Sequence, residues 1–151
     1  MLRPSKKMLY AIEAVLDIAY HAGGEPVQSR EITRRQGIPR RYLEQTLQQL
    51  VRSGILTGVR GPRGGYRLAR ERRRVSVGEI VRVVRALEAL EDTPEDLPSS
   101  DLGLEVIRPM WTDLQDELMR KLDAISIDDL CQKAHQTGIL SEVAQKMDFT
   151  I

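Results

Sequence analysis

The sequence contains a single cysteine, Cys131, and no long uncharged stretch. One thiol can neither form a disulfide within the chain nor supply the several thiolates of a multi-cysteine metal site. The longest run without a formal charge, 134–141, has 8 residues, whereas a membrane-spanning helix needs about 20. After Lys6 and Lys7 the apolar run is interrupted by Glu13, too early for a secretory signal. We therefore expect a cytoplasmic protein without a membrane partner.

The even overall charge balance hides a strong asymmetry. The chain of 151 residues has one domain's length and a net charge of +1. Residues 1–75 carry 16 Lys or Arg against 6 Asp or Glu, and residues 76–151 carry 7 against 16. This division predicts a basic half that faces a polyanion and an acidic half that points away from it.

Apolar spacing in the basic half predicts three helices, over 7–22, 30–36 and 39–53. Ser5 and Ser29 are placed to cap the first two, and Pro39 suits the first position of the third. Two short strands, 55–60 and 66–69, flank the turn Gly61–Gly65 and predict a β-hairpin. A hairpin directly after a helix-turn-helix makes residues 1–75 a winged helix-turn-helix DNA-binding domain.

The acidic half, 76–151, predicts a helical linker, an acidic loop, a long dimerisation helix and a C-terminal helix. Ser76 with Glu79 and Ser126 with Asp129 form capping boxes for helices over 77–90 and 127–136. Residues 91–103 show no period and predict the loop. From 104 to 125 apolar residues recur every three or four positions, and Pro109 predicts a start near Arg108 or a kink. The expected dimer interface is Ile107, Trp111, Leu114, Leu118 and Leu122. The predicted fold class is mainly α with a small β-hairpin.

Polar and basic side chains lie where a winged helix contacts DNA. Arg40, Arg41, Gln45 and Gln49 lie off the apolar stripe of the third helix, where arginine can bind guanine and glutamine adenine in the major groove. Arg60 and Arg63 flank a hairpin tip that suits the minor groove. Phosphate contacts are expected from three residues near helix starts, Lys6, Lys7 and Ser29. The alternative is a basic face that only solvates the domain.

The runs Ile38–Gln45 and Val59–Tyr66, with Val77–Glu79 and Trp111–Leu114, resemble the bacterial winged helix-turn-helix regulators that include IscR, NsrR and CymR. The resemblance covers roughly residues 1–135. It implies a homodimeric transcription regulator, most often a repressor, that binds a dyad-symmetric double-stranded DNA operator, with the long helix crossing its partner's. The DNA contacts that it implies are Arg40, Arg41, Tyr42, Glu44, Gln45, Arg60, Gly61, Pro62, Arg63 and Gly64.

One departure from this family concerns its iron-sulfur cluster. Members with a cluster carry three cysteines in the loop before the long helix, and some use a nearby histidine. Here 91–104 contains no cysteine, and Glu105 and Arg108 stand approximately where the last cysteine and the histidine would fall. A cluster needs several thiolates, so we expect none, and no other cofactor or metal.

Other functions have less support in the residues. Four glycines between 58 and 65 could suggest a phosphate loop, but the Gly-Lys-Ser/Thr ending is absent, so we do not expect an enzyme. A winged-helix interaction protein controlled by a partner protein remains the alternative, and a small-molecule or protein effector stays open. Cys131 is either a core residue or a redox sensor. His21 and His135 are isolated in the sequence, which favours ordinary polar roles over metal binding.

Overall fold

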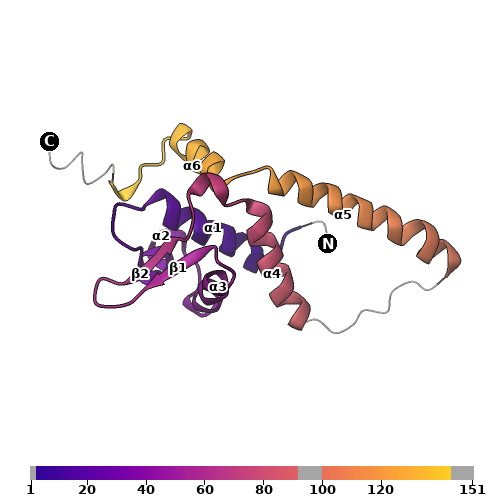
Figure 1. Cartoon of the computed structure of the whole chain (residues 1–151), viewed down its shortest axis with the longest axis horizontal. Helices are drawn as coiled ribbons and strands as arrows, with labels where there is room; N and C mark the ends of the chain where they lie inside the picture. Colours follow the sequence, from indigo (N-terminus) through magenta and orange to yellow (C-terminus); the bar gives the residue numbers. More distant parts are fainter. Residues whose placement is uncertain (1–2, 92–99, 144–151) are drawn as a thin grey trace.

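The computed structural model describes residues 3–91 and 100–143. Its elements follow in the order α1 (Lys6–Tyr20), α2 (Ser29–Gln36), α3 (Arg40–Arg52), β1 (Leu56–Val59), β2 (Gly65–Leu68), the short 3-10 helix η1 (Arg72–Arg74), α4 (Val77–Glu91), the π-helical turn η2 (Gly103–Ile107), α5 (Arg108–Asp123) and α6 (Ile127–Gln136). The predicted fold class, mainly α with a small hairpin, is confirmed (Figure 1). The predicted helices and strands are all present, with ends shifted by a few residues.

Helix α1 is the central element and contacts α2, α3, α4 and α6. Its buried face includes Ala14, Val15 and Ile18, at the spacing expected of an amphipathic helix. Ser5 caps the helix as predicted, because its hydroxyl accepts a hydrogen bond from the backbone N–H of Met8 at 3.2 Å. Helices α2, α3, α4 and α6 are therefore all positioned against α1.

Helices α2 and α3 form the predicted helix-turn-helix, and two details of the prediction are wrong. The cap of α2 is Gln28, whose backbone N–H donates to Glu31 Oε2 at 3.2 Å, so Ser29 is the first helical residue. Pro39 is the cap of α3 and lies outside the helix, which begins at Arg40. Between the helices Gly37 has φ of +67°, a conformation that favours glycine.

The wing is an antiparallel pair in which Leu56 faces Leu68 and Val59 faces Gly65. It is attached to the segment before α2, because Val27 and Tyr66 exchange two backbone hydrogen bonds of 2.9 and 2.8 Å. The wing and the start of α2 are therefore held together directly.

Two capping boxes and a backbone bridge order the junction at which α4 and α6 begin. Both predicted boxes are present, with Glu79 N bonded to Ser76 Oγ at 3.2 Å and Asp129 N to Ser126 Oγ at 3.0 Å. The residues before α4 and α6 pair across this junction, since Ile127 N donates to Val75 O at 2.8 Å. Helices α4 and α6 therefore begin side by side.

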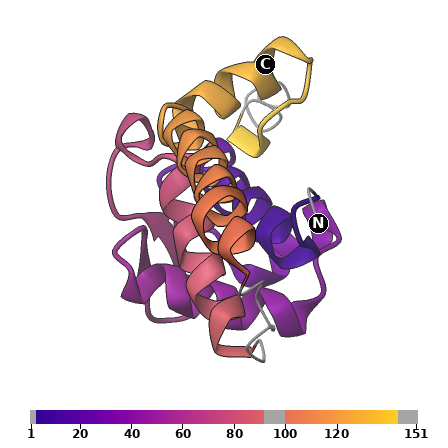
Figure 2. The ribbon, with the colours of Figure 1, turned by 90° about the vertical axis from the view of Figure 1, so that its right-hand side faces the viewer.

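Helix α5 extends away from this junction (Figures 1 and 2). The helical path starts at residue 101, and the wide turn η2 precedes Pro109, with Arg108 N–H bonded to Gly103 O. The predicted start near Arg108 is correct for α5, and η2 accommodates a proline that offers no N–H of its own. Most of the predicted loop, residues 92–99, lies outside the described residues.

A single cluster of buried residues joins both halves of the chain. Leu47 and Leu50 of α3 belong to it together with Ile80 of α4 and Ile127 and Cys131 of α6. The predicted boundary after residue 75 thus divides charge but not the core, and the division into two functional parts stays a prediction. No helix in the described ranges combines the length and apolarity needed to cross a membrane.

Candidate nucleic-acid interface

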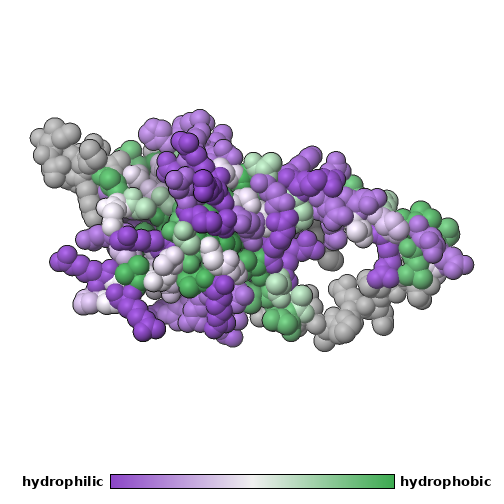
Figure 3. Space-filling model, viewed as in Figure 1, coloured by the Kyte–Doolittle hydropathy of each residue, from purple (hydrophilic) through white to green (hydrophobic). Residues whose placement is uncertain are grey.

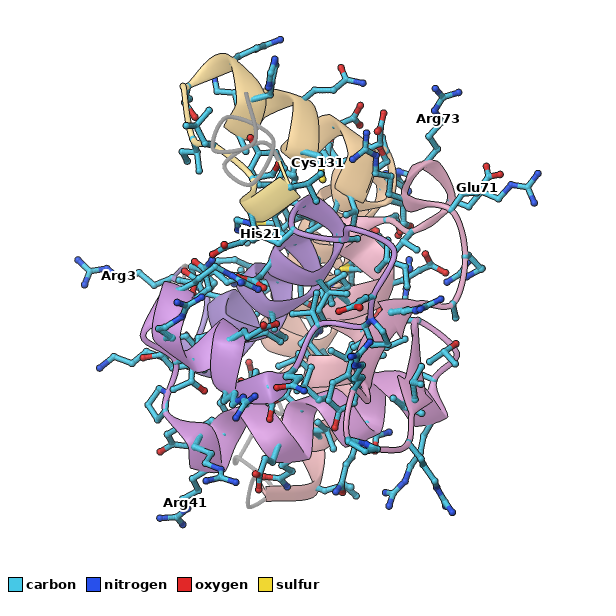
Figure 4. All side chains as sticks on the ribbon, turned by 90° about the vertical axis from the view of Figure 1, so that its left-hand side faces the viewer. Arg3, His21, Arg41, Glu71, Arg73 and Cys131 are labelled. Atoms are coloured by element: carbon cyan, nitrogen blue, oxygen red, sulfur yellow. The ribbon has the colours of Figure 1, made fainter. Side chains whose placement is uncertain are left out.

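Helix α3 presents a polar face to solvent because its apolar stripe is buried. Leu43, Leu47 and Leu50 are at most 1% exposed. The predicted contact residues Arg40, Arg41, Glu44 and Gln45 are all exposed, Tyr42 is 39% exposed, and Gln49 is partly buried. Figure 4 shows Arg41 extending into solvent at the edge of the molecule. The face opposite the core is therefore free to enter a groove.

Two weak contacts hold the exposed side chains at the start of α3. Arg40 Nε lies 3.0 Å from Glu44 Oε1, an ion pair between side chains that are 81% and 51% exposed. Exposed pairs of this kind contribute little free energy, so Arg40 can exchange Glu44 for a phosphate or a base at small cost. The Lys7 ammonium lies 5.8 Å from the centre of the Tyr42 ring. Tyr42 is thereby oriented by α1.

The tight turn at the wing tip requires glycine at two positions. Gly61 has φ of +111°, and Gly64 N donates to Gly61 O at 2.9 Å. A Cβ at Gly64 would overlap the backbone of Val59 and Gly61. The side chains of Arg60, Pro62 and Arg63 are exposed around this turn. The tip thus carries two exposed arginines on a tight turn that contains glycine at both Gly61 and Gly64.

A cleft of about 720 Å³ is lined by residues of α2, α3 and the wing. Five of the predicted residues line it: Ser29, Arg40, Arg60, Pro62 and Gly64. Arg30, in the first turn of α2, also lines it and was missed by the prediction. The signal that could have identified Arg30 is a basic residue beside the expected phosphate contact at a helix start. The structure therefore brings α2, α3 and the wing to one basic cleft.

A second hollow lies beside the start of α3. It is formed by Lys6, Lys7 and Tyr10 of α1, Pro39 and Tyr42, with Ser5 and Glu88 at its edge. Ser5 Oγ donates a hydrogen bond to the Glu88 carboxylate, which links the start of α1 to the end of α4. Lys6 is exposed, as a phosphate contact would have to be.

The arginines of 70–74 lie elsewhere. In Figure 4 Arg73 projects at the end of the molecule opposite to Arg41. Arg70 pairs with Glu79 at 2.8 Å and Arg72 with Asp128 at 2.7 Å. Part of the positive charge of the basic half therefore tethers α4 and α6, and only the remainder serves the cleft.

The predicted dimer residues form an uncovered apolar stripe on η2 and α5. Ile107, Trp111, Leu114 and Leu118 are 43, 46, 49 and 57% exposed, and Leu122 is half-buried near the junction. Hydrophobic side chains gather at the outer end of α5 (Figure 3), where Leu102 and Val106 are exposed too. Such a stripe is typical of a protein interface.

The donor set does not fit an iron-sulfur cluster. The only thiol, Cys131, is 3% exposed on α6, and burial raises the pKa of this thiol, which disfavours the thiolate that binds iron. Glu105 lies in η2 and Arg108 begins α5. Within the described residues, no group of three or more His, Cys, Asp or Glu side chains is arranged to hold a metal.

Comparison with known proteins agrees with this architecture. The sequence model of the Rrf2 family, described as an iron-dependent transcriptional regulator, matches residues 4–133. The chain is 33% identical over 151 residues to the HTH-type transcriptional regulator IscR of Xenorhabdus nematophila, covering 97% of this chain and 87% of the relative. It is 32% identical over 126 residues to the protein rrf2 of Nitratidesulfovibrio vulgaris, covering 83% and 84%.

Two solved structures are similar to the whole fold. IscR of T. potens gives a TM-score of 0.72 at 32% identity, covering 90% of each chain. CymR, the global cysteine regulator of B. subtilis, gives 0.69 at 28% identity, covering 88% of this chain and 98% of that one. The chain therefore belongs to the Rrf2 family of winged-helix transcriptional regulators.

Proposed function

We propose that this protein is a homodimeric, sequence-specific DNA-binding transcription regulator that acts as a repressor and carries no iron-sulfur cluster. The observation that supports this best is the single basic cleft between α2, α3 and the wing. Buried apolar faces hold these three elements in place, which supports the proposal because contacts to a duplex require groups on a rigid scaffold.

In this proposal α3 enters the major groove. Arg40, Arg41 and Gln45 contact base edges, with Tyr42 and Glu44 beside them. The wing tip, with Arg60, Gly61, Pro62, Arg63 and Gly64, approaches the adjacent minor groove, where a narrow backbone and arginine are favoured. Between the two grooves runs a phosphate backbone, which the cleft would receive.

Phosphate contacts come from the edges of this cleft. Ser29 and Arg30 stand at the start of α2, where the helix dipole favours an anion. Lys6 contacts a phosphate beside the start of α3. These contacts set the orientation of the domain, and the groove contacts supply sequence specificity.

Dimerisation follows from the stripe on η2 and α5. Two copies that bury Ile107, Trp111, Leu114, Leu118 and Leu122 against each other would remove this apolar surface from water. A two-fold axis through the α5 helices would place the recognition helices about 34 Å apart on one face of the duplex. The operator would then have dyad symmetry, and a bound dimer would block transcription by occupying it.

The absence of a cluster is supported by the lone, buried Cys131. Protein purified without oxygen should therefore show no stoichiometric iron and sulfide and no absorption band near 400 nm, the region of the spectrum that tests for a cluster. Such a band with matching iron would overturn this part of the proposal. The effector is then a small molecule or a protein rather than a change in a cluster.

Selection of bound duplexes from a random oligonucleotide pool tests the function as a whole. We expect a dyad-symmetric consensus, bound by a dimer in sedimentation, with affinity that falls steeply as salt rises because bound phosphates release counterions. No enrichment, together with a shallow salt dependence, would contradict DNA binding and favour a protein ligand.

A further inference from the structure

The chain after α6 returns to the helix-turn-helix. We name residues 139–143 the C-terminal strap; Figure 1 shows it leading from α6 toward α1 and α2. Tyr20 Oη donates a hydrogen bond to Ile139 O, and Glu142 N donates to His21 Nδ1 at 3.0 Å. Val143 packs on Gly23, where a Cβ would come within 2.6 Å of its methyl carbon. The strap therefore crosses the end of α1.

The Glu142 carboxylate connects the strap to α2. Its Oε1 lies 3.4 Å from Arg34 and 3.5 Å from Arg35. Arg35 also donates two hydrogen bonds, of 2.9 and 2.7 Å, to Asp17, a fully buried side chain of α1 that accepts a third from Gln36 at 2.8 Å. One guanidinium thus joins the strap, α2 and the core of α1.

We propose that Glu142 is a positioning residue for DNA binding, that it fixes α2 against α1 through Arg34 and Arg35, and that protonation of His21 releases it. The inference rests on the proposed function, because α2 carries Ser29 and Arg30 at the DNA cleft. The arginines that Glu142 contacts lie in the last turn of the same short helix. A shift of that turn moves the phosphate contacts at its start.

His21 makes the strap sensitive to pH. Its Nδ1 accepts the Glu142 N–H, which requires an unprotonated Nδ1, and Figure 4 shows His21 between α1 and the strap. The charged groups around it are Asp17 on its own helix, Glu31 and Arg35 on α2, and Glu142 on the strap.

Burial, followed by the positive charge of Arg35, lowers the pKa of His21 below its ordinary 6.5, against the opposing effect of the three carboxylates. Nδ1 must also be unprotonated to accept the Glu142 N–H, so the strapped state binds a proton less readily than the released state. The strap is therefore fully held above pH 6.5 and is lost as the pH falls through the lowered pKa.

The first test compares Glu142→Gln with Glu117→Gln, the same change at an exposed position of α5. Hydrogen exchange of 139–143 in the full-length protein reports the strap, and fluorescence anisotropy with the selected operator reports DNA binding, both at pH 7.5. Glu142→Gln removes two partly exposed ion pairs. We expect hydrogen exchange of the strap to become about threefold faster and operator affinity to become about threefold weaker. Glu117→Gln should change neither.

The second test measures both quantities between pH 7.5 and 5.5 in the wild type and in His21→Gln. A glutamine oxygen can accept the Glu142 N–H but does not titrate. We expect acid to speed exchange of the strap in the wild type and to weaken its operator binding relative to the variant, whose strap exchange stays constant after correction for intrinsic rates.

Each contrary result would refute a different part of the proposal. Unchanged exchange in Glu142→Gln would refute the strap contact, and faster exchange with unchanged operator affinity would refute positioning. An equal response to acid in His21→Gln would refute protonation of His21 as the trigger. If the wild type binds no duplex while the strap still responds, the proposed function fails and the positioning role with it, whereas the strap contact stands.

Discussion

Substitution of Gly64 by alanine tests whether the shape of the wing tip matters for DNA binding. A Cβ at Gly64 would lie 2.9 Å from Gly61 O and 3.0 Å from the Arg60 carbonyl carbon, and closer still to Val59 O. All three neighbours are backbone atoms, so no side chain can turn aside. Gly58, on β1 of the same hairpin, has no heavy atom within 4 Å of the corresponding position. Gly58 also lines the cleft, so Gly58→Ala adds the same methyl group to the same surface without the backbone clash and is the matched control.

The expected magnitude follows from overpacking. Forcing one methyl group into a filled space costs about 1 to 3 kcal/mol. The free wing can relax around the new methyl group, so the melting temperature of the domain should change little. DNA binding requires the original shape of the tip, and the strain then appears as a loss of operator affinity of about five- to 150-fold. Gly58→Ala should reduce the free energy of operator binding by less than about 0.5 kcal/mol.

The assay is fluorescence anisotropy with the selected operator, accompanied by thermal unfolding followed by circular dichroism. Equal affinities for Gly64→Ala and Gly58→Ala would refute the reasoning, since the two variants add the same methyl group to the same hairpin. A large fall in the melting temperature of Gly64→Ala would instead show that the tip contributes to global stability, contrary to the expected local strain.

Two further predictions concern the groove and the dimer. Arg41→Ala should weaken operator binding by about 1 to 3 kcal/mol if Arg41 contacts a base; equal losses on operator and random duplexes would make it a phosphate contact. Leu114→Asp combined with Leu118→Asp should give monomers without operator binding, because charges on the stripe cannot be buried together, and an intact dimer in sedimentation would contradict the α5 interface.

Much of the fold was predictable because its signals are local. The stripe of Leu43, Leu47 and Leu50, the two Ser-containing capping boxes and the glycines of the wing each lie within a few residues of the structure that they specify. The cap of α2 was mispredicted for a related reason. Gln28 caps α2 in place of Ser29, because Glu31 lies three residues after Gln28 and its carboxylate accepts the Gln28 backbone N–H.

Contacts between distant residues were not predictable from one sequence. Glu142 meets His21 across 121 positions, and Arg72 reaches Asp128 from the basic run that the charge count assigned to DNA. No periodicity marks either pair. The cleft shows the same limit, since Arg30 belongs to it only because the wing folds back against the segment before α2.

The attachment of α5 should determine the spacing of the operator half-sites. Arg82 of α4 binds Asp123, at the end of α5, through two hydrogen bonds of 2.7 and 2.6 Å. Gly78 lies against the same carboxylate, so α4 and α5 meet closely there. The backbone bridge between Ser76 and Ser126 fixes the adjoining residues. In a dimer formed through α5, the angle at this junction sets the separation of the two α3 helices.

Arg82→Ala should therefore leave the dimer intact but loosen this angle. We expect the variant to discriminate less well than the wild type between the selected operator and the same operator with one base pair inserted at its centre. Arg85→Ala, an exposed arginine one turn further along α4, is the control. The measurement is the ratio of the two affinities for each protein. If that ratio is the same in Arg82→Ala and the wild type, the junction does not set the spacing, and the symmetry of the complex must depend on contacts at the DNA itself.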